Sequence, residues 1–166
     1  MQVAAGRLLD ALFALEKWVA IAAFAVVTVC LFADVIGREL FGQGIFWAQR
    51  VSVYGATIAG LLGFALCTAR GGHLRPLSFD KLFPAALNVP VNRVADLVSF
   101  GICMFLATYG TEFVVNSFRL GERGQALDMP LWPVQMILPY CFASAGLRYL
   151  LFACFPVLRP VESEVA

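Results

Sequence analysis

The sequence predicts an all-α membrane protein with four transmembrane helices, and three observations support this fold class. The chain of 166 residues is 61% hydrophobic and 14% charged, with a mean hydropathy of +0.82, whereas soluble domains are about half apolar and about a quarter charged. A soluble fold of this length lacks the interior to bury so much apolar surface. Finally, four apolar stretches are each long enough to cross the ~30 Å hydrocarbon core of a bilayer.

We expect one membrane domain over residues 1–166, with spans at about 18–36, 46–69, 94–118 and 131–155. Pro139 is expected to kink the last span. The segment before the first span, residues 6–17, has one apolar and one polar side. Two interpretations of it stay open. It forms a short interfacial helix in the headgroup region, or it extends the first span.

Lys and Arg are unevenly distributed between the two ends of the expected spans. With the N-terminus inside, the cytoplasmic segments hold seven of them: Arg7, Lys17, Arg70, Arg75, Lys81, Arg93 and Arg159. The opposite side holds four: Arg38, Arg50, Arg119 and Arg123. Because cytoplasmic loops are enriched in these residues, we expect both termini in the cytoplasm.

Four ionisable residues lie within the expected spans, where they are costly and therefore candidates for function. They are Asp34, Asp96, Glu112 and Arg148. The topology places Asp96 and Arg148 toward the cytoplasmic side of neighbouring spans, which predicts an intramembrane charge pair. A proton or ion path is the alternative. We favour structural pairing for two reasons. No carboxylate lies mid-span, and the sequence lacks the broken helices in matching halves that are typical of carriers.

Several function classes find no support in the sequence. The net charge is +1 and no basic face is visible, so a nucleic-acid partner is not expected. The five cysteines form no CxxC, and His73 is the single histidine, so we expect no metal and no cofactor. Hydrolase, metalloprotease and nucleotide-binding motifs are absent, so an enzyme is not expected.

The connections and one helix face suggest where a partner binds. Gly55, Ala59 and Gly63 recur at every fourth residue, and such small-residue stripes allow close helix packing in membranes. The aromatic residues Trp47 and Trp132, with Arg50, complete the expected partner interface. After the second span, Arg70, His73 and Arg75 are expected to contact lipid headgroups or a partner loop.

Taken in order, these motifs resemble the small membrane subunit of tripartite ATP-independent periplasmic (TRAP) transporters. The resemblance rests on residues 34–38 (DVIGR), residues 46–48 (FWA), residues 69–75 (ARGGHLR) and residues 129–132 (MPLW). The chain departs from the family at Gln49 and Arg50, where two acidic residues are usual, and at Pro76 after the Arg/Gly/His loop. Any role that depends on acidity at positions 49 and 50 therefore does not carry over.

The resemblance implies a subunit of a secondary system that imports organic acids, of the dicarboxylate or sugar-acid type, with sodium across the bacterial inner membrane. Its expected partners are a large multi-span permease subunit, a periplasmic substrate-binding protein and membrane lipids. The chain would scaffold the large subunit and carry no substrate site itself. The loop at 121–128 would help to dock the substrate-binding protein.

Two other classes stay open as alternatives. The first is a small channel or carrier formed by self-association of the chain, and the second is a membrane enzyme or redox subunit. Transport by the purified chain alone would favour the first, and a bound chromophore would favour the second.

Overall fold

The structure is a computed structural model that describes residues 2–70, 88–124 and 129–155. Within these ranges the helices are, in order, α1 (Gln2–Phe41), α2 (Phe46–Ala69), α3 (Asn88–Leu120), α4 (Trp132–Gln135) and α5 (Ile137–Cys154). Four helical segments are long and apolar enough to cross a membrane: Gly6–Phe41, Phe46–Ala69, Arg93–Leu120 and Trp132–Cys154. The prediction of an all-α membrane protein with four spans is confirmed.

The first helix is continuous for 40 residues, so residues 6–17 extend the first span as the second interpretation proposed. At ~1.5 Å per residue α1 is about 60 Å long, roughly twice the ~30 Å hydrocarbon core. One end of α1 therefore has to leave the apolar layer or be covered by protein. Glu16, in the N-terminal half of α1, contacts α5, as described below.

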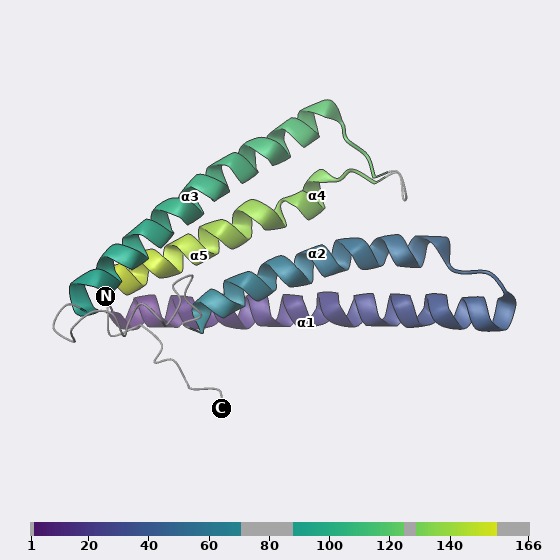
Figure 1. The fold of residues 1–166 in the computed structure, drawn as a ribbon, viewed down its shortest axis with the longest axis horizontal. Helices are drawn as coiled ribbons and strands as arrows, with labels where there is room; N and C mark the ends of the chain where they lie inside the picture. The colour runs from purple at the N-terminus through teal and green to yellow at the C-terminus, as the bar shows by residue number, and fades with distance from the viewer. Residues whose placement is uncertain (1, 71–87, 125–128, 156–166) are drawn as a thin grey trace.

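The helices form two antiparallel hairpins, and most contacts between the hairpins are those of α2 with α5. Helix α1 packs along α2, α3 packs along α5, and α2 packs on α5. Figure 1 shows the two hairpins close together at the N-terminal end of α1 and divergent toward the end that carries α4. The four spans are therefore splayed and do not form a compact bundle.

The last span is interrupted at Met136, between α4 and α5. Pro139 lies three residues further on and has no N–H to donate, and its ring crowds the carbonyl of the residue four positions earlier, Gln135. The break therefore falls where Pro139 is expected to disturb the helix. Before it, Trp132 packs edge-on against Phe118 of α3, with ring centroids 5.7 Å apart.

Asp34 organises the turn between α1 and α2. One carboxylate oxygen accepts a hydrogen bond from the backbone N–H of Ile45 at 2.7 Å, and the other accepts from the Arg38 guanidinium at 2.6 Å. Gly42 ends α1 with a φ of 69°, in the left-handed region that favours glycine. A methyl group at Gly44 would lie 2.8 Å from both Asp34 Oδ1 and Arg38 Nε. The DVIGR pattern therefore has a local structural role.

Removing the Asp34 carboxylate is expected to loosen this turn. Asp34→Ala leaves the Ile45 N–H without its acceptor, which costs about 1–3 kcal/mol for a buried group. Arg38 is 57% exposed, so Arg38→Ala should cost less than about 1 kcal/mol. Asp34→Asn keeps an acceptor for Ile45 and serves as the matched control. Thermal unfolding in detergent, followed by tryptophan fluorescence, measures all three. Equal destabilisation by Asp34→Ala and Arg38→Ala would contradict this account of the turn.

Candidate functional site

The most deeply buried polar feature of the described chain is an ion pair between Glu16 of α1 and Arg148 of α5. Arg148 Nη2 lies 2.7 Å from Glu16 Oε2, and each side chain is at most 1% exposed. The two residues are 132 positions apart in the sequence. Because an isolated charge inside protein or lipid is very costly, each residue makes the burial of the other possible.

Neighbouring groups satisfy the remaining hydrogen-bonding capacity of the pair. Arg148 Nη1 donates to the Ala65 carbonyl of α2 at 3.1 Å and to Ser144 Oγ at 3.0 Å. Ser144 in turn donates to Glu16 Oε1 at 2.5 Å, and the Tyr140 hydroxyl lies 3.4 Å from the same oxygen. We call Glu16, Ala65, Tyr140, Ser144 and Arg148 the buried polar cluster. It joins α1, α2 and α5, and therefore both hairpins.

The structure gives Arg148 a different partner from the one that the sequence predicted. Asp96 was expected to pair with Arg148, but the guanidinium faces Glu16, Ser144 and Ala65. Asp96 on α3 is itself buried, at 3% exposed, and makes an interaction of its own. The physical reason for the difference is the continuous α1, which carries Glu16 alongside α5 instead of out into the headgroup region.

The sequence analysis gave Glu16 no partner because it placed this residue on the polar side of segment 6–17, for which both an interfacial helix and an extension of the first span stayed open. One signal was available. Ser144 and Arg148 are four residues apart and share one face of a helix, so they present a hydroxyl and a guanidinium together. Such a face needs a carboxylate from another helix, and α1 supplies it. The fourth ionisable residue expected within a span, Glu112, is exposed on α3.

The predicted small-residue stripe on α2 divides between two environments. A methyl group at Gly55 would lie 2.6 Å from Val27 Cγ2 and 3.4 Å from the Ala23 carbonyl, so Gly55 allows α1 of the same chain to approach. Ala59 is half-buried. Gly63 is exposed, and nothing lies within 4 Å of a methyl group added there. Only the Gly63 end of the stripe is therefore open to another chain.

Two of the other expected contact residues, Trp47 and Trp132, lie at the starts of α2 and α4, and Arg70 lies at the opposite end of α2. Trp47, at the start of α2, is 53% exposed, whereas Trp132 is half-buried against Phe118. Arg70 is exposed at the end of α2, with its guanidinium 5.7 Å from the centre of the Phe13 ring. His73 and Arg75 lie outside the described residues, and so do residues 125–128 of the expected docking loop at 121–128.

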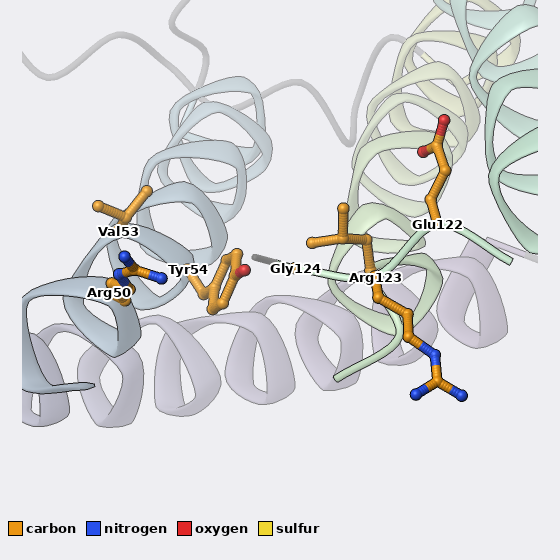
Figure 2. A pocket seen from close by; sticks show the side chains of 7 residues that line it. Arg50, Val53, Tyr54, Glu122, Arg123 and Gly124 are labelled. Carbon is orange, nitrogen blue, oxygen red and sulfur yellow. The ribbon is translucent and has the colours of Figure 1, made fainter. Parts of the chain in front are cut away.

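An open pocket lies between the start of α2 and the α3–α4 connection. It has a volume of about 550 Å³ and is lined by Arg50, Val53, Tyr54, Glu122, Arg123, Gly124 and Leu131. Figure 2 shows Arg50, Val53 and Tyr54 on one side, with Tyr54 directed toward Gly124 on the other. Glu122 accepts a hydrogen bond from Ser117 at 2.6 Å and so is held against α3. Within the described ranges, no three His, Cys, Asp or Glu side chains converge on a possible metal position.

Breaking one half of the buried ion pair should destabilise the chain more than removing both halves. Arg148→Met leaves the Glu16 charge uncompensated, and such losses cost about 3–5 kcal/mol. Replacing both residues, Glu16→Leu with Arg148→Met, removes the stranded charge and should recover most of the loss. Arg119→Met, at an exposed position of α3, is the matched control. The measurement is thermal unfolding in detergent together with the monodisperse fraction. A double variant no more stable than Arg148→Met would contradict the pairing.

Comparison with known proteins supplies the family. The model of the DctQ component of tripartite ATP-independent periplasmic transporters matches residues 27–156. The ectoine TRAP transporter small permease protein TeaB of Halomonas elongata is 28% identical over 128 residues, which cover 73% of this chain and 63% of the relative. The match thus spans less than two thirds of that relative. No solved structure matches the chain.

The DctQ match covers most of the membrane domain, including the Asp34 turn and the Ser144–Arg148 face of the buried polar cluster. Members of this family are components of transporters and not enzymes. The chain therefore belongs to the DctQ family, as a small permease subunit of a TRAP transporter.

Proposed function

We propose that this chain scaffolds the large permease subunit of its transporter and carries no substrate site itself. The observation that carries the proposal is the buried polar cluster, in which Glu16 and Arg148 are fully engaged with each other, Ser144 and the Ala65 carbonyl. A transport site needs polar groups that exchange protein partners for cargo or water. Groups held in a closed network instead stabilise a fixed arrangement of helices.

The outer surfaces of the helices support the same role. Only 6% of the residues in the most apolar stretch of α1 are buried within the chain. Large side chains such as Phe24, Val29 and Phe32 are about two thirds exposed. We assign the open end of the α2 stripe at Gly63, with Trp47 and Trp132, to contact with the large subunit. The remaining apolar surface faces lipid, and Arg70, His73 and Arg75 bind headgroups or the edge of the partner.

The orientation proposed for the chain has both termini in the cytoplasm of a bacterial cell, with the protein in the inner membrane. The Lys and Arg distribution of the sequence supports it, since the segments that this orientation assigns to the cytoplasm contain seven of these residues and the segments on the opposite side contain four. The α3–α4 connection then faces the periplasm. There it is placed to meet a substrate-binding protein.

For the complete transporter we propose uptake of an organic acid, of dicarboxylate or sugar-acid type, coupled to sodium. The support is the family resemblance. The relative named above is an ectoine transporter subunit, so ectoine belongs among the compounds to be tested. Selectivity is assigned to the other two components, because the charged groups of the buried polar cluster are engaged with one another and with Ser144 and the Ala65 carbonyl.

Co-purification tests the scaffold role and its interface. The tagged chain, extracted in mild detergent, should bring down a much larger multi-span protein. Gly63→Leu fills the open end of the stripe and should lower that recovery about tenfold. Gly101→Leu is the matched control, because Gly101 on α3 is exposed and equally open. Equal recovery with both variants would move the interface elsewhere. A chain recovered alone would contradict the scaffold role.

Uptake measurements test the cargo and the coupling ion. Liposomes that contain all three components should accumulate an organic acid only when a sodium gradient is imposed. Liposomes with this chain alone should accumulate none, because no pathway is assigned to it. Radiolabelled dicarboxylates, sugar acids and ectoine form the panel. Accumulation by this chain alone would instead support the self-associating channel or carrier.

A further inference from the structure

The pocket between the two hairpins lies at the level where lipid headgroups are expected. It begins one helical turn into α2, since Arg50 lies about 6 Å along the helix axis from Phe46 at ~1.5 Å per residue. Trp47, half-exposed beside it, and Trp132 of α4 belong to the residue type that marks the membrane interface. The pocket therefore spans the boundary between headgroups and acyl chains.

The polar end of the pocket is cationic. Arg50 is held in place by its stack on Phe46, with the guanidinium carbon 4.0 Å from the ring centre. A stacked guanidinium still directs its in-plane N–H groups outward, and these match the oxygens of a phosphate. Arg123 contributes to the opposite wall, although Figure 2 shows its guanidinium turned away from Arg50. The Glu122 carboxylate is hydrogen-bonded to Ser117.

The remaining walls are apolar. Val53, which is 60% exposed, and Leu131 face the space from opposite hairpins. The Tyr54 hydroxyl approaches Gly124 so closely that a side chain at position 124 has no room, and this contact closes one side of the pocket. Beyond it the hairpins diverge (Figure 1). The pocket thus combines a cation at the headgroup level with an apolar part, lined by Val53 and Leu131, which we call the apolar wedge.

We propose that this pocket binds one phospholipid, with its phosphate against Arg50 and an acyl chain along Val53 and Leu131 between the hairpins. A phospholipid fits both ends, because its phosphodiester is anionic and its chain is apolar. Water alone satisfies Arg50 but not the apolar wedge. A purely apolar protein helix satisfies the wedge but not the cation. The bound lipid fills the gap that splaying of the hairpins creates. This inference depends on the membrane fold and not on the proposed cargo or partners.

Native mass spectrometry of the full chain tests the proposal. The chain is purified in mild detergent, exposed to phosphatidylglycerol and then stripped by successive detergent washes. One phospholipid per chain should remain. Arg50→Gln should reduce its occupancy about tenfold, and so should Val53→Trp, which fills the apolar wedge from an exposed position. Arg119→Gln, an exposed arginine on α3 outside the pocket, should retain the lipid. Diacylglycerol, which lacks the phosphate, should not be retained.

Photocrosslinking locates the bound molecule. A phospholipid with a photoreactive acyl chain should label the α2 segment around Val53 and the segment around Leu131, and Val53→Trp should abolish the label. The proposal is overturned if the washed wild-type chain retains no phospholipid. It is also overturned if Arg50→Gln and Val53→Trp retain as much lipid as Arg119→Gln, or if the label falls outside these two segments. Monodisperse elution of each variant confirms that it is folded.

Discussion

The arrangement of the helices depends on one buried charge pair. Helices in lipid gain little from apolar contact with one another, because acyl chains are as apolar as leucine side chains. A polar group without a partner, in contrast, is costly there. The pair of Glu16 and Arg148 therefore fixes α1 against α5, since the two helices can be separated only by exposing two charges to an apolar environment. The Ala65 carbonyl extends the constraint to α2.

The position of this cluster also explains the splayed shape. The buried polar cluster joins the hairpins near the end that holds the N-terminus of α1, whereas at the α4 end Tyr54 of one hairpin lies against Gly124 of the other. At that second end each hairpin is instead organised by its own turn. Asp34 fixes the α1–α2 turn, and Gly121, with a φ of 63°, together with the Ser117–Glu122 hydrogen bond fixes the end of α3. Local turns of this kind set each hairpin but not the angle between them.

The sequence predicted the features that depend on neighbouring residues and misjudged the pairing between distant ones. Hydropathy and helix length were sufficient for the four spans, and the i, i+4 spacing of Asp34 and Arg38 is consistent with the ion pair that they form. The Glu16–Arg148 pair did not follow, because it required the register of α1 against α5 across 132 residues. The stripe on α2 was recognised as a packing surface, but periodicity cannot say that Gly55 packs on α1 of the same chain while Gly63 stays open.

The same interactions bear on which component of the transporter is proposed to bind the ion and the cargo. A carboxylate that couples transport must bind and release a cation, and so must be able to lose its protein partners. Glu16 accepts hydrogen bonds from Arg148 and Ser144, and Asp34 accepts from Arg38 and the Ile45 N–H. Releasing either one breaks a helix contact or a turn that the fold requires. Carboxylates with such structural roles are poorly suited to coupling, and this supports the proposal that another subunit binds the ion and the cargo.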